Sequence, residues 1–306
     1  MAYSSGGLIE ATDYNNLING SNQLNTVWNV GTGSAGYGQT AVSAVASTNT
    51  VTATQWASLV NTLNNARLHQ SGAGSGISAP TAGTTIAWLS TLQTQVNSAY
   101  TNRLTAAATG TLVTTTLATH NITGGTGAFS GTKALTFTWA NGNAARYFFN
   151  CGGRIGWNIT GVTNNNGTLR SADLVTNLAT NLAGGVMTNS ASTYTGTGGG
   201  TRTTNSIGYW GLTTSNQLGS RIFSSNYRYE YNSDYSEFNL KTSTANVGGN
   251  GDNGLQITVT IGWVEATTYA GFNDAVDVTM SWNGTYTPPA TTYLSASWGN
   301  PTIAAV

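Results

Sequence analysis

Residues 255–264 read Leu255-Gln256-Ile257-Thr258-Val259-Thr260-Ile261-Gly262-Trp263-Val264, and an apolar side chain occupies every other position. Successive side chains of a β-strand point to opposite faces of its sheet. This stretch has the strongest two-residue period in the chain, so it predicts a strand with one face in a hydrophobic core.

Similar patterns extend through the chain after about residue 108. Residues 135–139 and 155–159 alternate in the same way, and Gly/Asn turns separate the segments. Further strands are expected over residues 111–122, 145–151, 206–212, 221–231, 236–241, 275–282 and 292–298, and one helix, capped by Ser171, over residues 171–183. We predict an α+β protein in which residues 109–306 form a mainly antiparallel, jelly-roll-like β-sandwich.

Residues 1–108 carry apolar residues at helical spacing, which predicts helices over residues 13–28, 55–69 and 86–104. Thr12 is the expected N-cap of the first helix. Thr52 and Gln55 fit a capping box at the start of the second. We therefore expect a small helical module over residues 1–108, ahead of the sandwich domain.

The starts of the first two predicted helices repeat one pattern. Ala11-Thr12-Asp13-Tyr14 with Leu17-Ile18-Asn19 matches Ala53-Thr54-Gln55-Trp56 with Leu59-Val60-Asn61. This internal duplication predicts two similar helices that pack as a pseudo-symmetric pair. We expect the module to dock on partner proteins through a face made of Tyr14, Leu17, Trp28, Trp56 and Leu59.

The composition is unusual in its lack of charge. Only 7% of the 306 residues are charged, against about 25% in ordinary soluble domains, and ten basic residues balance ten acidic ones. Nucleic-acid binding is therefore not expected. Neither an apolar run long enough to insert in a membrane nor a signal-peptide pattern is visible. A neutral surface tends to associate, which suits a permanent assembly, although a secreted β-protein has a similar composition.

Side chains suited to catalysis or metal binding are few and scattered. Cys151 is the only cysteine, so no intrachain disulfide forms, and we expect it in the core. His69 and His120 lie in different modules, without a His/Cys cluster or a Gly-x-Ser-x-Gly motif. The glycine-rich residues 31–39 lack the preceding strand and following Lys of a nucleotide loop. We expect no cofactor, no metal site and no catalytic triad.

A glycosidase with paired carboxylates is one alternative function, since it needs two carboxyl groups about 5 to 9 Å apart across a sugar. The candidates are Glu230, Asp234, Glu237, Asp252, Glu265, Asp274 and Asp277. Asp252, Asp274 and Asp277 have the setting of turn residues, whose carboxylates bond nearby backbone N–H groups. Residues 250–253 could bind calcium, but one carboxylate makes a weak ligand set and a hairpin turn fits better. We therefore expect no enzyme activity.

A group of tyrosines is the one candidate contact surface in the second half. Tyr227, Tyr229 and Tyr231 would share one face of a strand, and Tyr235 follows closely. Exposed tyrosines could stack on a glycan or anchor a protein partner. Ordinary sheet packing is the alternative, and we favour it.

Four segments resemble a class of structural proteins in the particles of tailed bacteriophages. They are residues 11–15, residues 30–39, residues 51–56, and the Ala145-Arg146-Tyr147-Phe148-Phe149-Asn150-Cys151-Gly152-Gly153 segment. Cys151 stands where the class has Ser or Ala, which are also small. The resemblance covers the chain in patches from about Ile9 to Ile155, implies membership of a virion assembled in the host cytoplasm, and implies no catalytic residues.

The resemblance and the lack of charge together predict a virion structural protein of the tail, baseplate or fibre. Its expected partners are other phage virion proteins and copies of itself in a homo-oligomer, the trimer being common among phage appendages. Two alternatives stay open: a capsid decoration or head-fibre protein, and an adhesin that binds host surface glycans through Tyr227, Tyr229, Tyr231 and Tyr235.

Overall fold

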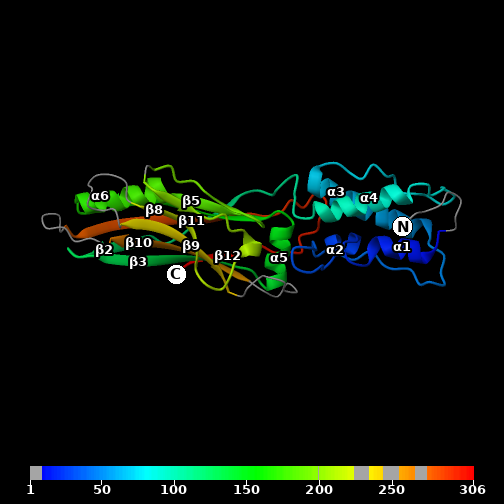
Figure 1. Ribbon diagram of the computed structural model, residues 1–306, viewed down its shortest axis with the longest axis horizontal. Coiled ribbons are helices and arrows are strands. Elements are labelled where there is room, and N and C mark those ends of the chain that lie inside the picture. Colours follow the sequence, from blue (N-terminus) through cyan, green and yellow to red (C-terminus); the bar gives the residue numbers. More distant parts are fainter. Residues whose placement is uncertain (1–8, 199, 224–233, 244–254, 266–273) are drawn as a thin grey trace.

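The computed structural model describes residues 9–198, 200–223, 234–243, 255–265 and 274–306. The molecule is elongated, with a group of helices at one end and two β-sheets at the other (Figure 1). Helix α5 (Gly142–Asn150) stands between the two parts. In the described residues no helix is both long and apolar enough to span a membrane.

The helical part contains α1 (Ala11–Ile18), α2 (Leu24–Trp28), α3 (Ala53–Ser71) and α4 (Leu89–Thr101). The single helix expected over residues 13–28 is wrong, because Gly20 and Asn22 adopt φ values of 118° and 69°, which end a right-handed helix. Thr12 is not the N-cap of α1. Glu10 takes that place, and its backbone N–H donates to the Asp13 carboxylate at 3.0 Å.

The duplicated helix starts are equivalent in the structure. Ala11 and Ala53 each begin a helix, and the Tyr14 and Trp56 rings meet edge to face, with centroids 5.1 Å apart. The predicted capping box of α3 is confirmed. The Gln55 backbone N–H donates to the Thr52 hydroxyl at 3.3 Å, and the Thr52 backbone N–H donates to the Gln55 side-chain oxygen at 2.8 Å.

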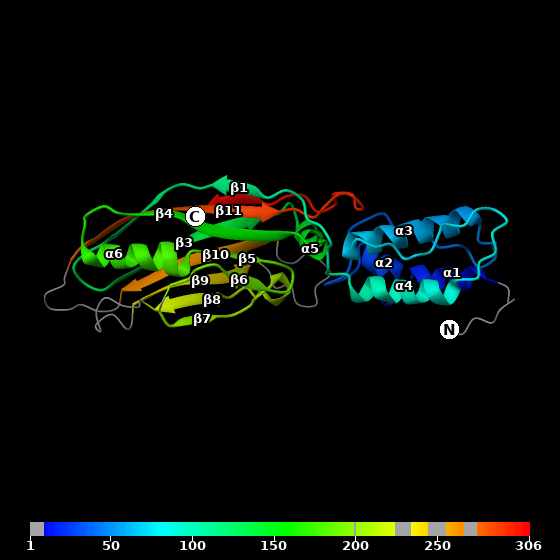
Figure 2. The same ribbon diagram turned by 90° about the horizontal axis from the view of Figure 1, so that it is seen from above.

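Among the described residues, two six-stranded antiparallel sheets form the other part, which confirms the predicted α+β class. One sheet has the order β1-β11-β4-β5-β6, with β2 also paired to β11: β1 (Val113–Thr116), β2 (His120–Gly124), β11 (Val276–Thr287), β4 (Arg154–Asn164), β5 (Gly184–Met187) and β6 (Ser192–Tyr194). The other has the order β12-β3-β10-β9-β8-β7: β12 (Thr302–Ala305), β3 (Phe129–Thr138), β10 (Gln256–Glu265), β9 (Tyr235–Thr242), β8 (Gln217–Phe223) and β7 (Arg202–Thr204). Seen from above, β1 and β7 lie along opposite long edges (Figure 2).

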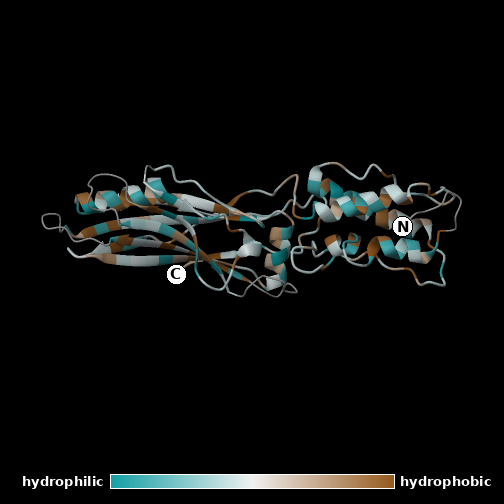
Figure 3. Cartoon of the chain, viewed as in Figure 1, coloured by the Kyte–Doolittle hydropathy of each residue, from teal (hydrophilic) through white to brown (hydrophobic). Residues whose placement is uncertain are grey.

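The strand expected from the alternation at residues 255–264 is β10, in the middle of its sheet. Ile257, Val259 and Ile261 are fully buried, and Ile257 pairs with Phe137 of β3. The other sheet closes the core, where the Trp157 and β9 Phe238 rings lie 5.8 Å apart. Hydrophobic residues alternate with hydrophilic ones in both parts (Figure 3).

Three sequence predictions fail in this part. Residues 145–151 were expected as a strand but lie in α5, where every residue from Ala144 to Asn150 is buried. Arg146 and Asn150 form a polar face one turn long, but this face is buried too, and the short, mostly apolar run around Arg146 resembles a central strand. Residues 206–212 contain a short 3₁₀ helix, η2 (Tyr209–Gly211), and residues 292–298 form no strand.

The helix expected over residues 171–183 is divided into α6 (Leu169–Thr176) and a π-helical turn, η1 (Asn177–Leu182). Its cap is Thr168, whose hydroxyl accepts from the Ser171 N–H at 3.2 Å, rather than Ser171 itself. The predicted boundary at residue 108 falls between the end of α4 and the start of β1, but Trp28 and Tyr37 pack into the core of the sandwich part.

Candidate functional site

The glycine-rich residues 30–37 form a closed loop at the end of the helical part. The Gly38 N–H donates to the Asn29 carbonyl and the Gln39 N–H to the Trp28 carbonyl, both at 2.9 Å, so the two ends of the loop are held together. Gly36 needs to be glycine: its φ is 95°, and an added Cβ would lie 2.1 Å from the Val30 carbonyl oxygen.

Helix α5 binds this loop through a fully buried cation. The Arg146 guanidinium donates to the carbonyls of Val30 and Ala35, both at 2.6 Å, and to that of Gly33 at 3.4 Å. It also lies over the Tyr147 ring, 4.6 Å from the centroid. Since a buried charge is stable only when its hydrogen bonds are met, these carbonyls fix the loop against the helix.

Asn150, one turn further along α5, reinforces the same contact. Its side-chain amide donates to the carbonyls of Ala35 and Gly36, both at 3.2 Å. Its oxygen accepts from the Trp210 indole N–H at 3.2 Å. Asn150 is fully buried, so the loop, α5 and the η2 segment are joined by one polar network inside the molecule.

The C-terminal part of the chain closes the junction from another side. The Gln39 side chain donates to the Ser295 carbonyl at 2.9 Å and accepts from the Ser295 N–H at 2.8 Å. The Ser297 hydroxyl donates to the Tyr37 carbonyl at 2.8 Å, and the Tyr37 hydroxyl accepts from Gln70 of α3 at 2.8 Å. The bonds to Ser295 and Ser297 connect segments more than 250 positions apart and make the two parts one body.

The titratable groups at the junction are held uncharged by burial. Burial lowers the pKa of His69 to about 4, against an opposing hydrogen bond with the Cys151 backbone. Burial raises the pKa of the Cys151 thiol well above its ordinary value. His69 packs edge to face on Tyr37 at 5.4 Å. At neutral pH the junction therefore holds the Arg146 cation among neutral groups, an arrangement suited to rigidity.

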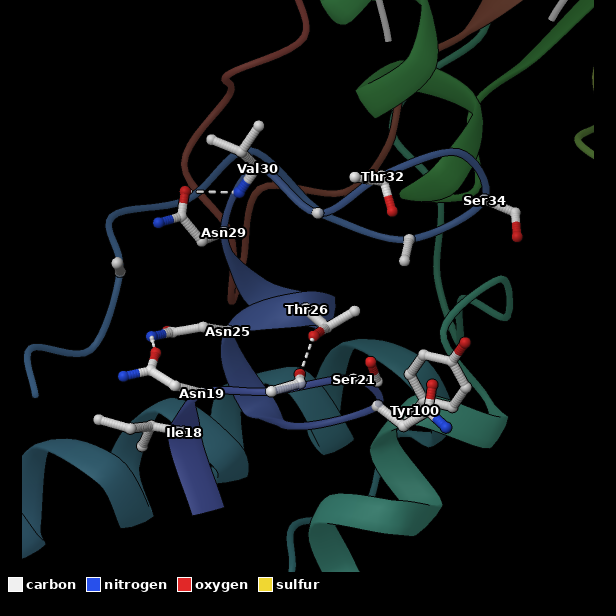
Figure 4. Close-up of a pocket in the computed structure, with 15 residues that line it drawn as sticks. Ile18, Asn19, Ser21, Asn25, Thr26, Asn29, Val30, Thr32, Ser34 and Tyr100 are labelled. Atoms are coloured by element: carbon white, nitrogen blue, oxygen red, sulfur yellow. Dashed lines mark hydrogen bonds between the residues drawn. The ribbon is translucent and has the colours of Figure 1, made fainter. Parts of the chain in front are cut away.

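An open hollow of about 660 Å³ lies on the opposite side of the same loop (Figure 4). Residues 29–35 form one wall, residues 18–26 form another, and Tyr100 of α4 borders it. The walls carry amide and hydroxyl side chains and contain no Lys, Arg, Asp or Glu. This hollow is the candidate ligand site of the helical part, and nothing in the sequence analysis pointed to it.

The expected docking face is wrong. Tyr14, Leu17, Trp28, Trp56 and Leu59 are at most 9% exposed. The duplicated apolar faces pack against each other and against α4 residues, so they form the core of the helical part and cannot reach a partner protein. An amphipathic pattern identifies a buried face but not what buries it.

The tyrosine strip lies mostly beyond the described residues, which exclude Tyr227, Tyr229 and Tyr231. Tyr235 is on β9 and is half-buried between Phe223, with ring centroids 5.7 Å apart, and the Arg221 guanidinium at 4.1 Å. At Tyr235 the sheet-packing alternative therefore describes the contacts.

Two of the candidate carboxylates come together, around a cation. Asp234 and Glu265 are buried and hydrogen-bond to each other, and Arg170 lies 3.4 Å from Glu265. Burial first, and Asp234 second, raise the pKa of Glu265 to about 8, although Arg170 opposes the shift. The Arg170 guanidinium also donates to the Gly127 carbonyl at 2.8 Å, so this cluster ties together several segments of the sandwich.

The other candidate carboxylates do not join this pair. Glu237 accepts from Arg221 at 2.7 Å, and Asp277 accepts from Asn165 at 2.9 Å. The backbone carbonyl of Asp274, rather than its carboxylate, accepts from Arg170 at 3.3 Å. Glu230, Asp252 and the calcium candidate at residues 250–253 lie outside the described residues. Within the described chain no three His, Cys, Asp or Glu residues gather as a metal site.

Arg146 and Asn150 are the junction residues that the sequence analysis missed. One signal was available: a single charged residue inside an otherwise apolar segment is typical of a buried, hydrogen-bonded charge. Its partners are carbonyls 111 to 116 positions away, which no local pattern identifies. No protein-family model, curated protein or solved structure matches this chain.

Proposed function

We propose that this protein is a non-catalytic structural component of a tailed-bacteriophage virion that assembles as a homo-oligomer. The observation that carries the proposal is an uncharged edge strand. Within the described chain β1 pairs only with β11, which leaves its other edge free. Leu112 and Val113 are 59% and 37% exposed there.

Free strand edges are normally protected from pairing with another chain by charge, proline or a covering segment. Residues 104–132, which include β1 and β2, contain no Lys, Arg, Asp, Glu or Pro. An edge of this kind is suited to a partner that covers it permanently, and a second copy of the chain supplies one by pairing at β1.

The build of the junction supports the same role. Arg146 joins the helical part and the sandwich into one elongated body, and the segments on both sides of the contact are among those that resemble phage structural proteins. A rigid, elongated and neutral body suits a tail, baseplate or fibre component, where a subunit transmits position along an assembly. The alternative is a capsid decoration protein, which would place the chain on the head of the particle instead of the tail.

The proposal is tested by light scattering on the purified full chain. Thr114, in β1, is exposed and should tolerate Lys, since surface substitutions usually change stability by about 0.5 kcal/mol or less. We expect the unmodified chain to have the mass of an oligomer and Thr114→Lys to have the mass of a monomer. Thr160→Lys is the matched control, since Thr160 is exposed on the central strand β4.

Two outcomes would count against assembly through β1. One is an unmodified chain that stays monomeric at high concentration. The other is a Thr114→Lys chain that keeps the oligomeric mass while Thr160→Lys does the same.

A further inference from the structure

The hollow beside the junction has the size of a small-ligand site, since such sites measure about 300–1,000 Å³. Several of its polar groups are committed to the protein. The Asn25 side chain both donates to and accepts from the Val42 backbone at 2.9 Å, and the Thr26 hydroxyl donates to the Gly20 carbonyl at 2.8 Å. These bonds give the lower wall a fixed shape.

Other polar groups of the walls are available. Ser21, Asn22 and Thr32 are exposed, and their side chains make no hydrogen bond within the part of the chain that the structure describes. Figure 4 shows the Thr32 hydroxyl directed from the upper wall toward the turn that carries Ser21. Hydroxyl and amide groups each donate and accept, so these three side chains can meet either role in a ligand.

The upper wall is held in place from behind. Arg146 occupies the Val30 and Ala35 carbonyls on the side of the loop that faces α5. The Val30 and Ala35 carbonyls are therefore already bonded to Arg146, and the loop offers the hollow mainly side chains such as Thr32. A wall fixed in advance costs less ordering when a ligand binds.

The charge pattern excludes most ligand classes. Two cations of the described chain contact wall residues. Arg146 donates to the Val30 and Ala35 carbonyls from the far side of the loop. The Arg103 guanidinium lies 4.3 Å from the centre of the Tyr100 ring and donates to the Ser34 and Tyr100 carbonyls, both at 3.0 Å. It therefore has little left to offer an anion. The walls lack a carboxylate for a cation, and their larger apolar residues are Ile18, which is fully buried, Val30, which is 51% exposed, and Tyr100.

We propose that this hollow binds a neutral saccharide. Such a ligand presents hydroxyl groups that both donate and accept, which matches Ser21, Asn22 and Thr32, and it needs no charge from the protein. The Tyr100 ring at the border offers one aromatic surface next to these polar groups. The site lies in the helical part, away from Tyr235 of β9.

The experiment is a titration of the full chain with cellotetraose, maltotetraose and the tetramer of N-acetylglucosamine, followed by NMR chemical shifts. Inorganic phosphate and an uncharged Ser/Thr-rich peptide serve as probes of other ligand classes. We expect saturable binding of at least one tetrasaccharide. The double variant Ser21→Ala/Thr32→Val should weaken it about 10-fold or more, since each lost hydrogen bond contributes about 0.5–1.5 kcal/mol.

Thr40→Val is the matched control, because Thr40 is exposed and is not part of the walls. It should leave the affinity unchanged. The proposal is overturned if none of the three tetrasaccharides binds, if phosphate or the peptide binds instead, or if the double variant binds as tightly as Thr40→Val. None of these results depends on the oligomeric state, so failure here is distinct from failure of the virion role.

Discussion

Replacing Arg146 with Met should release the loop from α5. Methionine keeps much of the length and volume of the arginine stem but removes the guanidinium. Two hydrogen bonds of 2.6 Å, to Val30 and Ala35, are lost together with the weaker one to Gly33. The Val30 carbonyl loses a strong donor, whereas Ala35 and Gly33 keep the Asn150 amide.

The magnitude follows from these partners. A hydrogen bond to a charged group contributes about 1.5–3 kcal/mol net of desolvation, so the two short bonds together contribute about 3–6 kcal/mol. Asn150 retains part of the contact at Ala35. We therefore expect Arg146→Met to lower the free energy of unfolding by about 2–4 kcal/mol.

The assay is equilibrium unfolding of the full chain in urea, with hydrogen exchange of the Gly38 and Gln39 amides as the local readout. Both amides close the base of the loop, so they should exchange faster in the variant. Arg154→Met is the matched control, because Arg154 is exposed and its guanidinium donates to the Thr109 hydroxyl at 3.2 Å. It should change stability by about 0.5 kcal/mol or less.

An Arg146→Met chain that unfolds within about 1 kcal/mol of the unmodified chain would refute the reasoning. The same holds if the Gly38 and Gln39 amides keep their protection. Either result would mean that the buried guanidinium does not hold the junction.

Two further predictions concern the core and the sandwich. The pKa of Glu265 is about 8 in the folded chain, above its ordinary 4.5, so between these pH values the folded chain holds a proton that the unfolded chain releases. The free energy of unfolding should therefore fall as pH rises through this range. Urea unfolding at pH 6.5 and 8 should show this decrease in the unmodified chain and not in Glu265→Gln. Trp56 is 2% exposed in the core of the helical part, so Trp56→Asp should unfold that part. A Trp56→Asp chain whose helical circular dichroism stays near that of the unmodified chain would contradict the burial of Trp56 in this core.

Local periodicity predicted the elements that have one polar and one buried face. The alternation at residues 255–264 identified β10 and its buried Ile257, Val259 and Ile261, because a strand of a two-sheet core shows its period directly. The Thr52–Gln55 pair marked the start of α3 for a similar reason: capping is a contact between residues three positions apart.

Other elements and contacts were missed. Helix α5 was predicted as a strand because residues 145–151 form a short, mostly apolar run, although two helical signals were present: Arg146 and Asn150 lie one turn apart on one face, and Asn141 caps the helix by accepting from the Ala144 N–H at 2.9 Å. The glycine-rich loop and the Arg146 segment were each noticed in the sequence, but not their contact. That contact depends on hydrogen bonds from Arg146 to carbonyls more than 110 positions away. Likewise, the hollow is lined by uncharged Ser, Thr and Asn side chains, which form no recognisable motif in the sequence.

The proposed membership of a virion is tested most directly by quantitative mass spectrometry of particles purified on a density gradient from lysates of the cells in which this chain is expressed. A structural component should be present in several copies per particle, at a fixed ratio to the other structural proteins. Absence of the chain from purified particles, with the whole amount recovered in the free fraction of the lysate, would contradict the proposed role.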